Sequence, residues 1–261
     1  MNHYALGDTN CINLPLASLL KNGFNTRQTD VRPAQSVNTA MQLIAVLFQI
    51  QSLQQFGGVS GIVDWTMVPY VKKSFYKHFK EGLDITEEEC TEDIGDYLSI
   101  VDTAYKSCPK AYKYAICMTE REVYQSAEGL FHNLNTLQSR SGNQLPFSSI
   151  VLGSCTLPEG RMVIKAILDV LYKGIGKLHR TSIFPCVIFQ VGKGINRNES
   201  DPNYDLYQQA LKCTAKRLYP NYVNLDWTGN AGYDKDDPET YASTMGEPRV
   251  TAHLKQRELV A

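Results

Sequence analysis

The second half of the chain alternates between short apolar runs and longer amphipathic segments, and this alternation constrains the fold more than any other feature. Apolar runs of strand length stand at 147–153, 186–192 and 222–226, and segments with helical spacing separate them at 160–177 and 204–218. Strands that alternate with helices in this way lie parallel in one sheet, because each helix carries the chain back to the same edge. The sequence therefore predicts an α/β sheet or barrel.

The first half is expected to be helical after one short strand. The predicted elements are a strand at 10–16 and helices at 36–56, 64–81, 94–105 and 119–141. Asp64 is a good N-cap residue, and Thr119 followed by Glu122 has the spacing of a capping box. Pro109 marks a break between two helices. These helices form an insertion between the first strand and the later strands.

Charge and composition exclude several classes of protein. The 261 residues carry 26 basic and 27 acidic side chains, for a net charge of -1, so no excess of cations exists to neutralise nucleic-acid phosphates. A hydrophobic fraction of 43% is that of a globular protein rather than a disordered one. We therefore expect a folded α/β core that does not contact nucleic acid directly.

Residues 33–63 contain no charged side chain, which raises the question of a membrane span. The stretch also carries several Gln and Asn residues, which are costly in hydrocarbon, so a buried or interface helix is the better prediction. No secretory signal is visible at the first residues, and the seven cysteines form no CxxC pair. We expect reduced thiols and a cytoplasmic location.

Most motifs that carry chemistry are absent from the sequence. It contains no GxxxxGK[ST], GxSxG, HExxH or CxxC, and its five histidines are scattered, so neither a metal site nor a cofactor site is predicted. Gly192-Lys193-Gly194 follows a strand and could approach a phosphate, although an ordinary surface turn is favoured.

Two features remain as candidates for a site. Cys11 stands inside an apolar run, where chemistry alone favours a small buried hydrophobe. The segment 139–149 is the densest polar group, and a loop leading into a strand can offer such side chains to a ligand or use them structurally. The candidate substrate-binding residues in this segment are Ser139, Arg140, Gln144, Ser148 and Ser149.

Five blocks of sequence, in order, carry a resemblance to a known family. They are residues 4–14 (YALGDTNCINL), 55–58 (QFGG), 139–149 (SRSGNQLPFSS), 201–206 with 216–220 (DPNYDL and KRLYP), and 244–246 (TMG). Together they resemble the anaerobic, glycyl-radical (class III) ribonucleoside-triphosphate reductases over nearly all of residues 2–246.

The resemblance implies a ten-stranded α/β barrel, with about its first half in residues 1–246. It also implies a ribonucleoside triphosphate substrate and a homodimer whose interface helices, here those following Ser36 and Thr119, bind deoxynucleotide effectors. Cys11 matches the strand cysteine that assists reduction at C2′, and 139–149 matches a segment near the substrate. The full-length family uses a glycyl radical, installed by an S-adenosylmethionine/iron-sulfur activating enzyme, and a structural zinc.

The sequence departs from the family at one essential position. Where the family has its thiyl-radical cysteine after Met-Gly, this chain has Glu247, and a carboxylate cannot carry a thiyl radical. Residues 247–261 are predicted to be a polar tail outside the family, and no glycyl-radical or zinc motif is present. We expect a reductase fragment that is inactive alone. The alternatives are a nucleotide- or effector-binding, dimerising module without catalysis and, least favoured, an unrelated α/β enzyme that uses Cys11.

Overall fold

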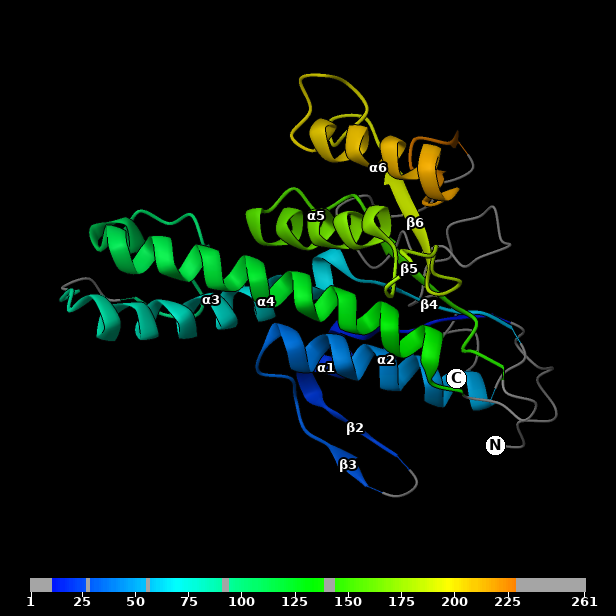
Figure 1. The fold of residues 1–261 in the computed structure, drawn as a ribbon, viewed down its shortest axis with the longest axis horizontal. Coiled ribbons are helices and arrows are strands. Elements are labelled where there is room, and N and C mark those ends of the chain that lie inside the picture. The colour runs from blue at the N-terminus through cyan, green and yellow to red at the C-terminus, as the bar shows by residue number, and fades with distance from the viewer. Residues whose placement is uncertain (1–10, 27–28, 55–56, 91–93, 139–143, 229–261) are drawn as a thin grey trace.

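The computed structural model describes residues 11–26, 29–54, 57–90, 94–138 and 144–228, and its framework is a five-stranded parallel sheet (Figure 1). The strands, in their order across the sheet, are β1 (Ile12–Asn13), β4 (Val59–Ile62), β5 (Ser148–Leu152), β6 (Cys186–Val191) and β7 (Asn221–Asn224). The predicted α/β class is confirmed. The proposed boundary between 246 and 247 lies outside the described residues.

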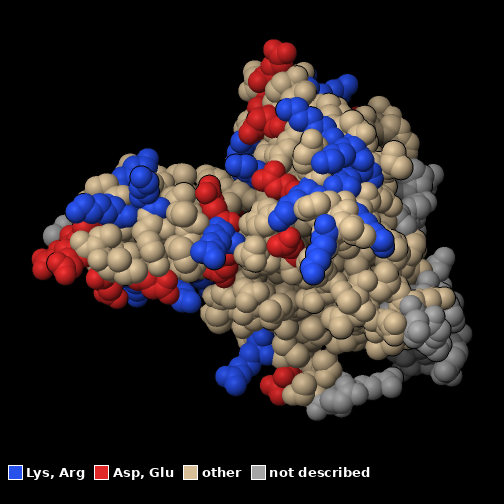
Figure 2. All heavy atoms as spheres, in the orientation of Figure 1, with Lys and Arg blue, Asp and Glu red and all other residues tan. Residues whose placement is uncertain are grey.

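Six α-helices, one 3-10 helix and a small hairpin accompany the sheet in the described part of the chain. They are α1 (Leu16–Asn22), α2 (Val37–Gln54), α3 (Asp64–Thr86), α4 (Pro109–Thr136), α5 (Pro158–Lys173), α6 (Tyr204–Arg217), the 3-10 helix η2 (Ala104–Ser107), and the antiparallel pair β2 (Phe24–Asn25) and β3 (Asp30–Val31). In Figure 1, α3 and α4 run side by side and project away from the sheet. Acidic side chains gather at the projecting end (Figure 2), where α3 ends in an acidic stretch.

The two faces of the sheet have different surroundings. Successive residues of a strand point to opposite faces. On β5, Ile150 and Leu152 therefore pack into the large core that the helices share, while Val151 packs with Ile62 and Ile188 on the other face. The helices thus cover one face of the sheet, and the second face belongs to a separate cluster.

The strand β4 was not predicted, and it divides the helical insertion into two parts. It pairs in parallel with β1 on one side and with β5 on the other. All four of its residues are buried, although two of them are Ser60 and Gly61. Pairing on both edges, rather than β propensity, explains this strand.

The predicted capping box at Thr119 is wrong, because α4 begins ten residues earlier at Pro109. Pro109, predicted as a break, instead occupies the first position of the helix, where its missing N–H is harmless. The carboxylate of Glu88 caps this end, accepting hydrogen bonds from the backbone N–H groups of Lys110 (3.4 Å) and Ala111 (2.9 Å). Thr119 itself is buried in the middle of the helix.

Two other local predictions are also wrong. The segment 94–105 forms turns and the start of η2 rather than an α-helix, since the Asp102 carboxylate accepts from the Ala104 N–H (2.9 Å). Asp64 is the first residue of α3 rather than its N-cap, and its side chain reaches the loop after β5.

The uncharged helix α2 is largely buried, as the sequence predicts. Met41, Ile44 and Phe48 are buried in the main core, whereas Val46 and Leu53 are exposed. Nowhere in the described part of the chain does a helix combine the length and hydropathy needed to cross a membrane.

Candidate active-site face of the sheet

A polar row crosses four neighbouring strands on the face that the helices leave uncovered. Asn13 is in register with Ser60, Ser60 with Ser149, and Ser149 with Cys186. Residues in register on adjacent strands point to the same face. Ser149 and Val151 are two residues apart on β5, so they also point to the same face. The row therefore shares its face with Val151 and the small apolar cluster beside it.

The hydroxyl of Ser149 differs from the other polar groups in the row. Ser60 Oγ donates to Asn13 Oδ1 (3.2 Å), and Cys186 Sγ lies 3.6 Å from the Tyr219 hydroxyl. Ser149 is 1% exposed, and its Oγ has no hydrogen-bond partner among the described residues. An unpaired buried hydroxyl costs about 1–3 kcal/mol, which makes Ser149 a candidate for a ligand contact.

Cys11 stands directly before β1, the strand that carries Asn13 of the polar row. Ile12 packs against the helix-covered core, and Asn13 points the other way, toward the row. The Cys11 side chain is half-buried, and its thiol is free. The structure thus places Cys11 at the start of β1 and Ser149 on β5, two strands away in the same sheet.

The other predicted site residues are placed differently. Ser148 precedes Ser149 and points to the helix-covered face, where its hydroxyl donates to the Pro146 carbonyl (3.1 Å). Gln144 is exposed. Ser139, Arg140 and Glu247 lie outside the described residues.

Sequence reasoning missed a buried carboxylate at the carboxyl end of this face. Asp64 is fully buried, and its Oδ2 accepts from the backbone N–H groups of Gly153 (2.9 Å) and Cys155 (3.0 Å). Its Oδ1 accepts from the N–H of Trp65 (2.9 Å). Burial raises the pKa of Asp64 to about 6, against the opposing effect of these hydrogen bonds. Only the tertiary structure brings Asp64 to the end of β5.

Two buried asparagines hold the same loop from the other side. Asn196 Nδ2 donates to the carbonyls of Gly153 (3.0 Å) and Gln190 (2.8 Å), and Asn203 Nδ2 donates to the Cys155 carbonyl (2.8 Å). Gly153 has a φ of +117°, and a Cβ there would stand 2.9 Å from the Gln190 carbonyl oxygen. The loop after β5 is therefore rigid and tied to the ends of β4 and β6.

Trp65 closes the carboxyl end of the face. Its ring packs against the apolar cluster of Ile62, Val151 and Ile188, and its Nε1 donates to Ser154 Oγ (3.0 Å). The Gly192-Lys193-Gly194 turn lies nearby. Two of its backbone donors are already occupied, Gly192 N–H by Asn196 Oδ1 (3.1 Å) and Lys193 N–H by Asp226 Oδ2 (2.8 Å), so these two groups serve the structure.

Comparison with known proteins identifies the relatives of this chain. The profile of the family "Anaerobic ribonucleoside-triphosphate reductase" matches residues 1–249. The anaerobic ribonucleoside-triphosphate reductase of Haemophilus influenzae is 31% identical over 218 residues, covering 83% of this chain and 28% of the relative. The enzyme of Enterobacteria phage T4 is 33% identical over 221 residues, covering 84% of this chain and 33% of the relative.

Solved structures show the same fold. The anaerobic ribonucleotide reductase from Thermotoga maritima in complex with dATP and CTP superposes with a TM-score of 0.51 at 15% identity, covering 86% of this chain and 34% of that one. The same protein with citrate in its active site gives a TM-score of 0.54 over 86% of this chain and 38% of that one. The chain spans about a third or less of the length of the curated relatives it matches. It belongs to the anaerobic ribonucleoside-triphosphate reductase family.

Proposed function

We propose that this chain takes part in the reduction of ribonucleoside triphosphates by supplying part of the substrate-binding face of a reductase barrel. The observation that carries the proposal is the buried hydroxyl of Ser149, which has no partner among the described residues and lies in the polar row of a sheet whose edge strand β1 directly follows Cys11. On this proposal, residues 1–246 are the amino-terminal half of the barrel and residues 247–261 are a separate tail.

The chemistry assigned to each residue follows from its side chain. A thiol gives up hydrogen readily and can donate a proton, so Cys11 would assist loss of water and reduction at C2′. The Ser149 hydroxyl can both donate to and accept from a ribose hydroxyl. In the same substrate site, Ser139, Arg140, Gln144 and Ser148 would contact the nucleotide or hold the loop, with Arg140 suited to a phosphate.

We also propose that the isolated chain does not reduce nucleotides. Glu247 occupies the position of the thiyl-radical cysteine, and the glycyl radical and zinc of the family are assigned to no residue of this chain. Incubated anaerobically with CTP, a family activase, S-adenosylmethionine and a reductant, the chain should form no deoxynucleotide. Detection of dCTP above a no-enzyme control would overturn the proposal.

A second candidate function is effector binding and dimerisation through α2 and α4. Residues 37–54 of α2 contain no charge, and Leu53 is 65% exposed, which suits an interface between subunits. A Thermotoga maritima relative binds dATP in a specificity site. We propose that deoxynucleotides bind a homodimer of this chain near these helices, and that the protein acts in the cytoplasm.

If the polar row binds the substrate, a nucleotide should raise the Tm of the chain, and this rise should depend on Ser149. CTP should raise the Tm of the wild-type chain, because a ligand that binds only the folded state stabilises it. Ser149→Ala should reduce this rise at least severalfold, since one hydrogen bond to the ligand is lost. Without ligand, the variant should be at least as stable as wild type, because it loses no hydrogen bond within the described structure and no longer buries an unpaired hydroxyl.

The matched control for this experiment is Ser182→Ala. Ser182 is 4% exposed, and its hydroxyl also has no partner among the described residues, but it lies in the loop before β6 rather than in the polar row. Its CTP response should equal that of wild type. Equal CTP responses from Ser149→Ala and wild type would exclude Ser149 from the site, whereas a dATP response that survives in Ser149→Ala would indicate a separate effector site.

A further inference from the structure

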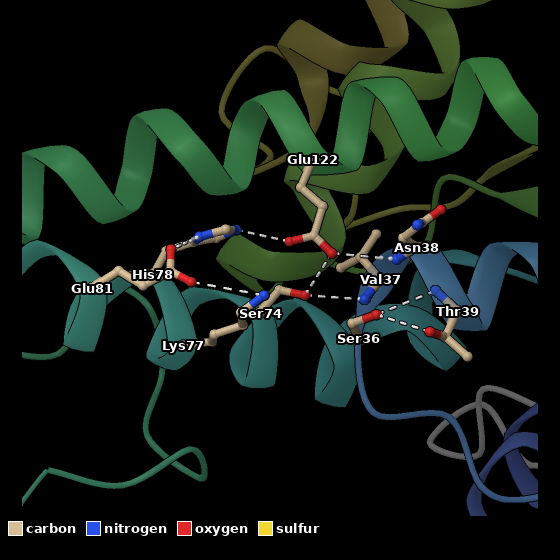
Figure 3. A network of polar contacts seen from close by, with 9 residues as sticks. All are labelled: Ser36, Val37, Asn38, Thr39, Ser74, Lys77, His78, Glu81 and Glu122. Carbon is tan, nitrogen blue, oxygen red and sulfur yellow. Dashed lines mark hydrogen bonds and ion pairs between the residues drawn. The ribbon is translucent and has the colours of Figure 1, made fainter.

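His78 on α3 lies between two carboxylates, and Figure 3 shows the arrangement. Its Nδ1 is 3.0 Å from Glu81 Oε2, and its Nε2 is 2.8 Å from Glu122 Oε2. A neutral imidazole has one N–H and one lone pair, so it can donate to only one of these oxygens. Only the imidazolium form donates to both carboxylates. The geometry therefore favours a protonated His78.

The second oxygen of Glu122 connects this ion pair to the amino end of α2. Glu122 Oε1 accepts from Ser74 Oγ (3.0 Å) and from the backbone N–H of Asn38 (3.4 Å). Ser74 Oγ in turn accepts from the backbone N–H of Val37 (3.0 Å). Val37 and Asn38 open α2, and their N–H groups have no partner inside the helix. Side chains of α3 and α4 thus complete the first turn of α2.

Among the described residues, the charges that act on His78 come from two helices. Glu81 faces the imidazole from α3 and Glu122 faces it from α4, while α2 contributes no charged residue. Lys77 pairs with Glu81 at 3.7 Å, with its side chain 69% exposed. The His78 side chain is only 10% exposed, so its ion pairs are shielded from solvent. If His78 loses its proton, a ring lone pair faces one of the two carboxylates, and the positive charge that holds Glu122 is lost.

We propose that the imidazolium of His78 is a positioning group that fixes the amino end of α2 through Glu122 and Ser74. The nucleotide and dimer contacts of α2 then depend on proton concentration. This second statement rests on the effector role proposed above for α2, whereas the first rests on the contacts alone. His78, Glu122 and Ser74 together form the clamp of α2.

The direction of the pH dependence follows from the charges. The hydrogen bond to Glu122, opposed by burial and supported by Glu81, raises the pKa of His78 above its usual 6.5. Its stabilising effect is therefore complete below pH 6.5 and is lost as the pH rises through the raised pKa. Burial tends to raise the pKa of Glu122, but the hydrogen bonds from His78, Ser74 and Asn38 lower it below 4.5. Glu122 therefore becomes protonated only in more acidic solution.

The first test measures unfolding without ligand across pH 5.5–9. Wild type should be more stable than His78→Gln at pH 6, and the difference should shrink as the pH rises through the raised pKa. The matched control is His132→Gln, an exposed histidine on α4, which should follow wild type at every pH. A difference between wild type and His78→Gln that stays constant with pH would overturn the clamp.

Glu122→Gln gives a second readout in case His78→Gln does not fold. The amide cannot neutralise the imidazolium, so the NMR titration of the His78 ring should move to lower pH. An unchanged titration would also overturn the clamp, because it would show that Glu122 does not hold the proton.

The second test uses dATP as the probe and compares its Tm shift at pH 6 and pH 8.5. In wild type the shift should fall severalfold at the higher pH, while in His78→Gln it should be small at both. His132→Gln, measured in the same buffers, shows how much of the change in Tm shift comes from the titration of the nucleotide itself. A dATP shift identical in wild type and His78→Gln would overturn the link to α2 but leave its effector role intact. If dATP shifted the Tm of neither wild type nor a variant, while unfolding without ligand depended on pH as expected, the effector role would be refuted and the clamp would be retained.

Discussion

Asp64→Ala is expected to lower the free energy of unfolding by about 3–5 kcal/mol, because three backbone donors lose their acceptor in a buried site. The donors are the N–H groups of Trp65, Gly153 and Cys155, and Asp64 itself has no exposed surface. Water that enters the space recovers only part of this loss. Urea denaturation at pH 7, followed by circular dichroism, measures the change.

A surface aspartate provides the control. The side chain of Asp205 is 64% exposed and pairs with Arg161 at 2.8 Å, and an exposed ion pair contributes about 0–1 kcal/mol. Asp205→Ala should therefore change stability little. If Asp64→Ala were no more destabilised than Asp205→Ala, Asp64 would not be the residue that holds the loop after β5.

The pH dependence of Asp64 has the opposite sign from that of a salt-bridged carboxylate. Its pKa in the folded chain, about 6, is above the usual 3.8, so the folded state holds its proton more tightly than the unfolded state. The associated stabilisation is present below pH 3.8 and is lost as the pH rises to about 6. Asp64→Asn cannot titrate, so the stability of wild type relative to this variant should fall across that interval.

The sequence predicts the parallel strands well and the β4 strand not at all. The runs 147–153 and 186–192 are dense in apolar residues, and β5 and β6 form within them. In β4, Ser60 and Gly61 interrupt the apolar run. The strand therefore forms because it pairs with β1 and β5. Pairing between segments far apart in the chain leaves no mark on a local pattern.

The same distinction explains the candidate site. Polarity alone selects the segment that contains Ser148 and Ser149, but only the register of the sheet shows that they point to opposite faces. The spacing of Glu122 from Thr119 predicts a capping box, yet the side-chain partners of Glu122, Ser74 and His78, lie on another helix. Local rules thus identify residues with a special role, whereas the role itself depends on tertiary neighbours.

Phe75→Ala is expected to lower the free energy of unfolding by about 3–5 kcal/mol, the usual range for removing a buried aromatic ring. Phe75 has no exposed surface, and its ring centroid lies 4.8 Å from that of Tyr105, 5.9 Å from Tyr112 and 6.4 Å from Phe79. Edge-to-face contacts with the two tyrosines add to the burial. The ring therefore joins α3, α4 and η2, and urea denaturation of the variant measures its contribution.

Tyr97→Ala is the matched control for this prediction, because Tyr97 is an aromatic residue that is 65% exposed and lies beside the middle of α3, where Lys72 donates to its carbonyl. Its removal should change stability by no more than about 0.5 kcal/mol. The form of the unfolding curve carries further information. Because α3 also packs on α5 and the sheet, loss of Phe75 should weaken the whole chain in one transition. A separate early transition would show that the projecting part of α3 and α4 unfolds independently, and a loss below about 1 kcal/mol would contradict the role of the aromatic cluster.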